Sequence, residues 1–300
     1  MIIISISDIH LVNQNPISRK DNLCETQIKK LKFVLNYAKQ NDAIIVINGD
    51  WFDSPRSFYT LSQIAELIKD HNIYAVYGQH DTYYYSHSTR HATNLGVLNK
   101  SNLVTILGPE PIISDDFNLY GCSITEPIPE ILDNSKLNIL SIHAPISDTA
   151  LFSTHKFINA EDFLTENNFD IIFCGDIHKK FLIEKDNKVI LNSGPMLRIE
   201  CTEYNFQHKP GFYLINTETK NIKFIEIPHE PADDVLSRLH IVTSIEKKTT
   251  LNDFAATLHN KGTVKNEEID IKKKIIKYFD DNKIDNEIKE LFSELISKEN

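Results

Sequence analysis

Short, nearly continuous runs of apolar residues, many of them β-branched, recur along the first 180 residues of the chain. They occupy positions 2–6, 43–47, 73–77, 138–142 and 171–174. Runs of this length predict strands that are buried on both faces of a sheet. Between them, apolar residues recur at helical spacing and predict helices over 25–38, 61–69 and 159–167. Strands that alternate with helices indicate an α/β core.

The pattern changes after residue 178. Four further strands are predicted at 181–184, 188–191, 211–216 and 222–227, with turn-forming pairs such as Asp186-Asn187 between several of them. We expect these strands to form an antiparallel sheet that packs on the first. A Pro-His-Glu-Pro segment at 228–231 is a predicted boundary, which gives a domain over 1–230 and a small C-terminal capping or docking region over 231–300.

The C-terminal region predicts helices rather than strands. A short helical candidate covers 251–258, and charged residues alternate with apolar ones from 267 onward. The last predicted helix carries one apolar stripe, made of Ile284, Ile288, Leu291, Phe292, Leu295 and Ile296. Such a stripe either lies in the groove of a partner protein or packs on residues 235–265 of the same chain.

Composition narrows the class of protein. Apolar residues make up 41% of the chain and charged residues 25%, which is typical of a globular protein and excludes disorder of the whole chain. No apolar run approaches the ~20 residues that cross a bilayer, so we expect no membrane partner. The N-terminus lacks the basic start of a signal peptide, and the four cysteines form no CxxC pair, so we expect a reduced, cytoplasmic compartment.

Polar side chains follow each of the first five predicted strands at the point where the strand ends. These clusters are Asp8-Ile9-His10, Gly49-Asp50-Trp51-Phe52-Asp53, Gly78-Gln79-His80-Asp81, His143-Ala144-Pro145 and Gly175-Asp176-Ile177-His178. Open α/β sheets bind ligands at the carboxyl ends of their strands, so we expect these side chains to share one edge. Any one of these motifs alone is an ordinary turn, but turns do not require histidine after four different strands.

A mixed set of aspartate and histidine ligands suits Mn²⁺, Fe or Zn²⁺ better than Ca²⁺ or Mg²⁺. There are too many candidate ligands here for one tetrahedral ion. Two ions roughly 3.5–4 Å apart would use them and would share a bridging carboxylate. Such a pair polarises a phosphoryl group and lowers the pKa of a bound water, which is the chemistry of phosphoester hydrolysis.

The order DxH, GD, GNHD, H, GHxH resembles that of the calcineurin-like metallophosphoesterases, and the match extends over residues 1–180. The resemblance implies a two-sheet sandwich of four layers, αββα. It also implies that Asp8, His10 and His178 hold the first ion, that Asp50 bridges, and that Gln79, His143 and Asp176 hold the second. His80 would then stabilise the transition state or protonate the leaving oxygen.

Two positions depart from the family pattern, and both belong to the second ion. Gln79 stands where the family has Asn, and Asp176 stands where it has the first His of GHxH. A carboxylate in place of an imidazole makes the site harder and favours Mn²⁺, with Fe or Zn²⁺ as alternatives.

Within this family the chain is most similar to SbcD-type DNA repair exonucleases. The similarity rests on Asp8-Ile9-His10, on Gly49–Asp53 followed by Pro55-Arg56-Ser57, and on Asn192-Ser193-Gly194-Pro195-Met196. It implies a DNA exonuclease or endonuclease of repair or recombination that docks on an SbcC-like, SMC-type ATPase. A net charge of −10 disfavours unaided DNA binding, which also points to a partner or to a second copy of the chain.

Two other functions remain open at this stage. One is a phosphodiesterase for a small cyclic or dinucleotide substrate, and the other is a scaffold that keeps the fold without catalysis. Scaffolds of this kind tend to lose His80 or the bridging Asp50, and both are present. No substrate-binding residues are assigned, although Tyr83–Tyr85 can either stack on bases or pack against the rim, and Lys179, Lys180 and Arg198 are candidates for phosphate contacts.

Overall fold

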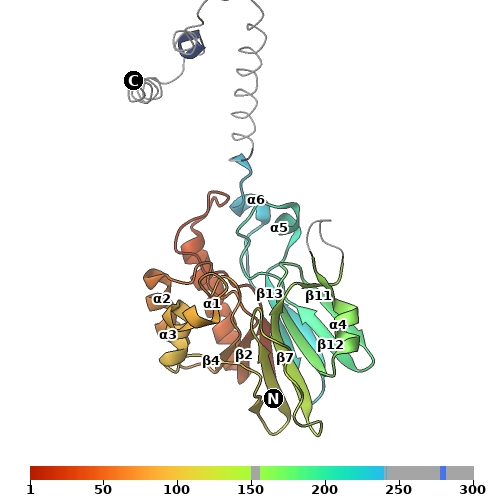
Figure 1. The fold of residues 1–300 in the computed structure, drawn as a ribbon. Coiled ribbons are helices and arrows are strands. Elements are labelled where there is room, and N and C mark those ends of the chain that lie inside the picture. Colours follow the sequence, from red (N-terminus) through yellow and green to blue (C-terminus); the bar gives the residue numbers. More distant parts are fainter. Residues whose placement is uncertain (150–155, 240, 242–277, 282–300) are drawn as a thin grey trace, which may run out of the picture. The chain divides into compact units, whose positions relative to one another are not determined.

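The computed structural model describes residues 1–149, 156–239, 241 and 278–281. The chain divides into two compact units, Met1–His240 and Ile241–Asn300, and the fold described below is that of the first unit (Figure 1). The helices predicted at 251–258 and 284–296 lie outside the described residues. No helix in the described ranges is long and apolar enough to cross a bilayer.

The first sheet has six strands in the order β14-β13-β1-β2-β3-β4. Four of them run parallel: β1 (Ile2–Ile6), β2 (Ala43–Ile47), β3 (Ile73–Ala75) and β4 (Thr105–Ile106). The other two, β13 (Gly211–Asn216) and β14 (Asn221–Glu226), extend the sheet antiparallel beyond β1, with Ile4 opposite Leu214.

The second sheet also has six strands, in the order β11-β12-β10-β7-β6-β5. Its parallel centre consists of β6 (Phe117–Cys122), β7 (Leu137–Ala144), β10 (Ile171–Asp176) and β12 (Lys188–Asn192). Its antiparallel edges are β5 (Ile112–Ile113) and β11 (Phe181–Lys185). A separate pair, β8 (Ile146–Ser147) and β9 (Ile158–Asn159), is parallel.

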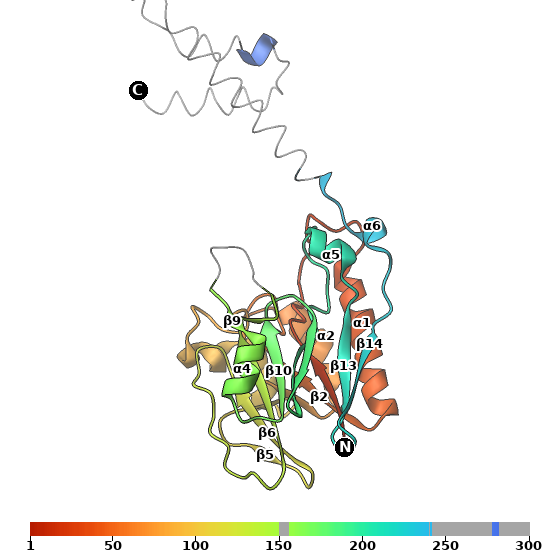
Figure 2. The same ribbon diagram turned by 90° about the vertical axis from the view of Figure 1, so that its right-hand side faces the viewer.

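Helices cover the outer face of each sheet, which gives the expected αββα layers (Figures 1 and 2). The first sheet is covered by α1 (Leu23–Gln40), α2 (Phe58–Ile68) and α3 (Asn94–Lys100), and the second sheet by α4 (Ala160–Glu166). The 3₁₀ helix η1 (His87–Ala92) precedes α3 and has no buried residue. Side-chain oxygens of Asn22 and Ser57 cap the first turns of α1 and α2. Between the sheets lies an apolar layer that includes Ile3, Val46, Ile139 and Phe173.

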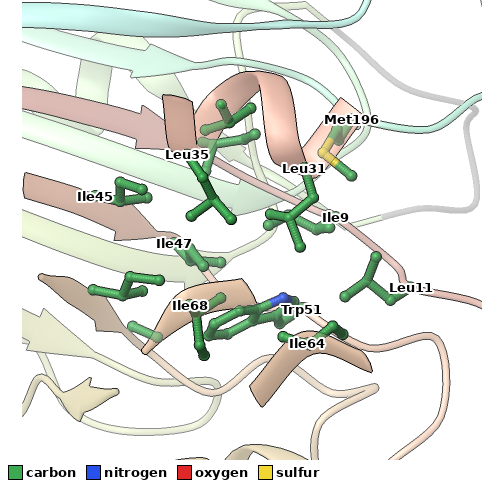
Figure 3. Close-up of a cluster of buried hydrophobic side chains, with 14 of the residues drawn as sticks. Ile9, Leu11, Leu31, Leu35, Ile45, Ile47, Trp51, Ile64, Ile68 and Met196 are labelled. Carbon is green, nitrogen blue, oxygen red and sulfur yellow. The ribbon is translucent and has the colours of Figure 1, made fainter. Parts of the chain in front are cut away.

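The loop after β2 is anchored by Trp51, a fully buried side chain that follows Asp50 directly. Its ring packs among Ile47, Ile64 and Ile68, in the cluster that joins α1 and α2 to the first sheet (Figure 3). Truncation of a buried tryptophan to alanine destabilises a fold by about 3–5 kcal/mol. This packing therefore fixes the positions of the polar residues on either side of Trp51.

The sheet assignment made from the sequence was wrong in one respect. The strands after residue 178 do not form a sheet of their own, since β11 and β12 join β10 and β7 while β13 and β14 join β1. Strand β6 was missed, because Asn118 and Gly121 lower its strand propensity. Its glycine is needed, since a Cβ at Gly121 would lie 2.3 Å from the Cβ of Leu107.

Residues just past the predicted boundary at 230 belong to the first unit, which extends to His240. Two short helices, α5 (Glu203–Gln207) and α6 (Ala232–Val235), contact each other there, and Phe206 packs against Val235. Backbone hydrogen bonds join Lys20 to Val235 and Ser237 to Ser18. The segment that follows β14 is therefore tied to the loop between β1 and α1.

Candidate metal centre

The polar clusters that follow the strands lie together because the carboxyl ends of the two parallel sheet centres meet. The backbone N–H of His10 donates to the carbonyl of Asp50, so the loops after β1 and β2 run side by side. Across the sheets, the backbone N–H of Asp176 donates to Oδ1 of Asp8 at 3.0 Å, and Nδ1–H of His143 donates to the carbonyl of Asn48 at 2.7 Å. The expectation of one rim thus holds in space, although the five strands belong to two sheets.

Several of these residues have left-handed backbone conformations, which L-residues other than glycine rarely adopt. The φ angles are 50° at Asp8, 46° at His10, 48° at Asp50 and 98° at Asp176. Such strained residues persist only where their surroundings hold them in place, and they concentrate at functional sites. The strain turns these side chains toward a common centre.

One group of candidate ligands consists of Asp8, His10 and His178. Nε2 of His10 lies 2.9 Å from Nε2 of His178, and Nε2 of His178 lies 3.7 Å from Oδ1 of Asp8. One carboxylate oxygen and two imidazole nitrogens thus converge from the loops after β1 and β10, as the sequence predicts for the first ion.

A second group surrounds His143. Nε2 of His143 lies 3.5 Å from Oδ2 of Asp50, and Asp8 lies close enough to complete a triad with them. Oε1 of Gln79 lies 2.8 Å from the same Nε2, and Nε2 of Gln79 donates to Oδ1 of Asp176 at 2.7 Å. The residues expected to hold the second ion are therefore linked to one another.

Asp50 lies between the two groups. Its Oδ1 accepts the backbone N–H of His80 at 2.8 Å, while its Oδ2 lies 3.7 Å from Nε2 of His10 and 3.5 Å from Nε2 of His143. This carboxylate has no exposed surface. A single aspartate with one oxygen facing both histidines is the arrangement that a bridging ligand requires.

Three buried polar atoms in this cluster have no hydrogen-bond partner among the described residues: Oδ2 of Asp8, Nδ1 of His10 and Oδ2 of Asp50. A buried polar atom without a partner destabilises a fold by about 1–3 kcal/mol, and native structures contain few of them. Carboxylate and imidazole atoms of this kind are ligands for divalent transition metals. The donor set therefore fits a pair of such ions.

The electrostatic field of the cluster favours positive charge. Burial lowers the pKa of His143, but the carboxylates of Asp50, Asp8 and Asp176 together outweigh it and raise the pKa to about 10. At His10 burial dominates and lowers the pKa to about 3, so its imidazole is neutral and able to ligate. Burial also raises the pKa of Asp8, against the opposing charges of His178 and His143.

His80 stands beside the ligands and is partly exposed. Its ring contacts that of His10 edge to face, with 4.8 Å between centroids. Nδ1 lies 3.0 Å from the carbonyl oxygen of Asp53, and because a carbonyl only accepts, Nδ1 carries the hydrogen. Burial lowers the pKa of His80, but the charge of Asp50 and the Asp53 carbonyl outweigh it, and the net shift is upward.

Two further residues of the site were not assigned from the sequence. Asp53 forms a third group with His10 and His80, and its Oδ1 lies 3.7 Å from Nδ1 of His10. Asp81 is fully buried and accepts the backbone N–H groups of Trp51, Phe52 and Gly78 at 3.1–3.3 Å. It thereby fixes the loop after β2 to the loop after β3. The signal for both was present, since each lies in a cluster already singled out.

Glycines make room for the ligands at two positions. A Cβ on Gly49, whose φ is +87°, would lie 2.1 Å from Nδ1 of His143. A Cβ on Gly78 would lie 2.1 Å from Oδ1 of Asp50. The backbone therefore approaches the ligands more closely than any other residue type allows.

The cations suggested for phosphate contacts are otherwise engaged. Nζ of Lys179 lies 3.5 Å from Oδ1 of Asp148, and Nζ of Lys180 lies over the ring of Phe224. Arg198 is buried and donates to the carbonyl of Glu230. The Asn192–Met196 turn, in contrast, supports the centre, because the backbone N–H of Met196 donates to the carbonyl of Asp8.

A comparison with protein families agrees with this architecture. A family model described as calcineurin-like phosphoesterase matches residues 1–180. No curated protein matches the sequence. Among solved structures, an archaeal phosphodiesterase is 15% identical with a TM-score of 0.43, and the alignment covers 75% of this chain and 99% of that one.

Two other solved structures that resemble this chain carry different names. Vps29 from Entamoeba histolytica, solved with Zn²⁺, is 12% identical, with a TM-score of 0.38 and coverage of 76% of this chain and 100% of that one. A 5'-nucleotidase precursor from Thermus thermophilus is 9% identical, with a TM-score of 0.40 and coverage of 87% of this chain and 59% of that one.

Proposed function

The chain belongs to the calcineurin-like phosphoesterase family, whose members bind two divalent metals, and from this we propose that it is a metal-dependent DNA nuclease of SbcD type. The observation that carries the proposal is the buried Oδ2 of Asp50, which faces both His10 and His143 and has no hydrogen-bond partner among the described residues. A carboxylate in this position would hold two cations at once.

Within this proposal each side chain has a defined role. Asp8, His10 and His178 would hold one ion, Gln79, His143 and Asp176 the other, and Asp50 both. The ions, when bound, polarise the phosphodiester and lower the pKa of the attacking water. We propose Mn²⁺ as the native metal, because Asp176 and Gln79 add oxygen donors to the second set.

His80 has the geometry of a proton donor to the leaving oxygen. The Asp53 carbonyl holds its Nδ1–H, which leaves Nε2 available to a substrate. The net upward shift of its pKa increases the protonated fraction near neutral pH. Its partial exposure also allows a phosphodiester to approach.

The choice of DNA as substrate rests on the SbcD-like motifs. The Asn192–Met196 turn is one of them, and it holds the first ligand loop: Oγ of Ser193 accepts the backbone N–H of Ser7, and Met196 binds the carbonyl of Asp8. We further propose an SbcC-like ATPase as the partner, since a chain of net charge −10 is repelled by DNA.

One assay tests the proposal. The purified full-length protein with Mn²⁺ is incubated with single-stranded DNA, double-stranded DNA, cyclic and linear dinucleotides, and a chromogenic phosphodiester, with Asp50→Ala as the control. DNA cleavage that Asp50→Ala abolishes would support a nuclease. Hydrolysis of the dinucleotides alone would instead support a phosphodiesterase for small substrates. Absence of all hydrolysis would contradict an enzyme and favour a scaffold.

A further inference from the structure

His178 is the most exposed residue of the first group of candidate ligands. Its side chain is 49% exposed, whereas that of Asp8 is fully buried and that of His10 is 4% exposed. Close packing fixes the position of a buried side chain, but it holds a half-exposed imidazole only in part. The position of His178 therefore depends on the backbone of residues 176–180, which carries it from the end of β10 into the following loop.

Side chains from two later segments hold this backbone on either side of His178. Nδ2 of Asn192, at the end of β12, donates to the carbonyl of Ile177 at 2.8 Å. The backbone N–H of Lys180 donates to the hydroxyl oxygen of Tyr204 at 2.9 Å. Tyr204 lies on the short helix α5, which follows β12 in the chain (Figure 1). The loop that carries His178 is therefore shaped by segments that come after it in the sequence.

The hydroxyl group of Tyr204 is oriented by His208. Nε2 of His208 lies 2.7 Å from the carbonyl oxygen of Pro195, and because a carbonyl only accepts, Nε2 carries the hydrogen. Burial lowers the pKa of His208 to about 4, so the ring is neutral and its Nδ1 is an acceptor. The hydroxyl of Tyr204, 3.2 Å from this Nδ1, therefore donates to it. That direction leaves the lone pairs of the hydroxyl oxygen to accept the backbone N–H of Lys180.

Tyr204 and His208 act as a pair because α5 places them one helical turn apart. Their rings stack with 5.3 Å between centroids and 24° between planes. The backbone N–H of His208 donates to the carbonyl of Tyr204 at 2.8 Å, and the side chain of Thr202 caps the first turn of the helix. The three segments meet at Gly194, where an added Cβ would lie 2.9 Å from Cε1 of His208 and 3.3 Å from the backbone nitrogen of Lys180.

The same pair is also connected to the loop after β1. Pro195, whose carbonyl accepts from His208, forms a parallel bridge with Ser7. The next residue, Met196, donates its backbone N–H to the carbonyl of Asp8 at 3.3 Å. Helix α5 therefore contacts the backbone beside two of the three ligands of the first group, one through the tyrosine and the other through the histidine.

We propose that Tyr204 and His208 are positioning residues of the metal centre: the tyrosine hydroxyl, oriented by the imidazole, holds the backbone after β10 so that His178 can bind the first ion. This inference rests on the proposed metal-dependent function and adds two residues that lie outside the five ligand clusters. Both act through the backbone of other residues. Partners that orient metal ligands from outside the ligand set typically change metal affinity or activity by about 10–100-fold when they are mutated.

The test is the variant Tyr204→Phe, which removes one oxygen atom and keeps the ring that stacks on His208. The full chain is stripped of metal with EDTA, transferred to buffer without chelator and titrated with Mn²⁺ in a calorimeter. Tyr204→Phe should weaken Mn²⁺ binding about tenfold or more. In a His208→Ala background the same change should have a much smaller effect, because the hydroxyl has already lost the group that orients it. Fully additive effects would contradict the role of His208.

The matched control is Tyr120→Phe. The hydroxyl of Tyr120 accepts the backbone N–H of Leu132 at 3.0 Å, in a loop between β6 and β7 that carries no candidate ligand. Each variant leaves one backbone N–H without its acceptor, so both should lower the Tm of the metal-free protein, but only Tyr204→Phe should weaken Mn²⁺ binding. Unchanged Mn²⁺ affinity in Tyr204→Phe, or an equal loss in Tyr120→Phe, would overturn the inference alone. A wild type that binds no Mn²⁺ would contradict the proposed function and this inference with it.

Discussion

Asp50 and His80 are joined by a hydrogen bond, yet their side chains have different chemical roles. The carboxylate of Asp50 faces His10 and His143, whereas the imidazole of His80 is held at Nδ1 by the carbonyl of Asp53. The contact between them uses the backbone N–H of His80, which any residue at position 80 other than proline keeps. Removing the side chain of His80 should therefore leave the carboxylate of Asp50 in place.

We predict that His80→Ala keeps its metal and loses turnover by ~10²-fold or more, because a positioned acid contributes that much to proton transfer. Asp50→Ala should lose both metal and activity, since its carboxylate serves two ions. Metal content by elemental analysis, measured beside hydrolysis of a chromogenic phosphodiester, separates the two variants. Loss of metal from His80→Ala would show that the imidazole is a ligand instead.

A second residue-scale prediction concerns Lys30, a buried lysine outside the candidate ligand set. Its Nζ donates to the carbonyl of Met196 at 3.0 Å. Burial, assisted by the charge of Arg198, lowers its pKa from 10.5 to about 7. Between these values the unfolded chain keeps a proton that the folded chain has lost, so the free energy of unfolding rises as pH increases.

The matched variant is Lys30→Met, which keeps the length of the side chain and removes its titration. Relative to the variant, we expect the free energy of unfolding of the wild type to rise by up to about 1.4 kcal/mol per pH unit between roughly pH 7 and 10. Urea denaturation of both proteins across this range gives the difference directly. A difference that stays constant, or that falls with pH, would mean that Lys30 keeps its proton when folded.

At the scale of elements, the centre depends on how closely the loop after β2 approaches β7. Gly49 has a φ of +87°, and its Cα faces the ring of His143 from the opposite sheet. The same ring donates its Nδ1–H to the carbonyl of Asn48, one residue earlier. The two sheets therefore meet at a point where a single methyl group does not fit.

We predict that Gly49→Ala displaces His143 and destabilises the fold by more than about 1 kcal/mol, because the backbone is strained and the space is filled. Metal affinity should fall with it. The control is Gly108→Ala, where nothing lies within 4 Å of the added Cβ, and which should change stability by no more than about 0.5 kcal/mol. Thermal unfolding and metal titration of both variants test this, and a stable Gly49→Ala that retains its metal would refute it.

At the scale of the whole molecule, charge and the C-terminal stripe bear on how the protein reaches DNA. Net charge −10 opposes DNA binding. The stripe from Ile284 to Ile296 remains a prediction from the sequence, because these residues lie outside the described ranges.

We predict that deleting residues 282–300 leaves hydrolysis of a small phosphodiester unchanged and removes binding to an SbcC-like ATPase or to a second copy of the chain. The metal ligands all lie before residue 180, within the first unit, so they do not require these residues. Pull-down with the ATPase and analytical ultracentrifugation measure the two interactions. Unfolding of the truncated protein, or partner binding that survives the deletion, would show that the stripe is ordinary core.

The amino-acid sequence by itself determined many of the strand segments of this protein and the polar clusters that follow them. β1, β2 and β13 have the predicted bounds, because runs such as Ile2–Ile6 are buried on both faces and leave a local signal. The candidate ligands were singled out for the same reason, since each lies in a cluster that follows such a run. Their roles stay predictions until metal and activity are measured.

Only the tertiary structure decided which strands are neighbours and what lies between the loops. No local pattern indicates that β12 pairs with β10 or that β13 pairs with β1, because the paired strands are separated along the chain. The hydrogen bond from Trp51 to Asp81 and the exposure of Tyr84 also depend on how segments that are separated along the chain pack together. Periodicity records whether a side chain is buried, whereas the identity of its neighbours is fixed only when the whole chain packs.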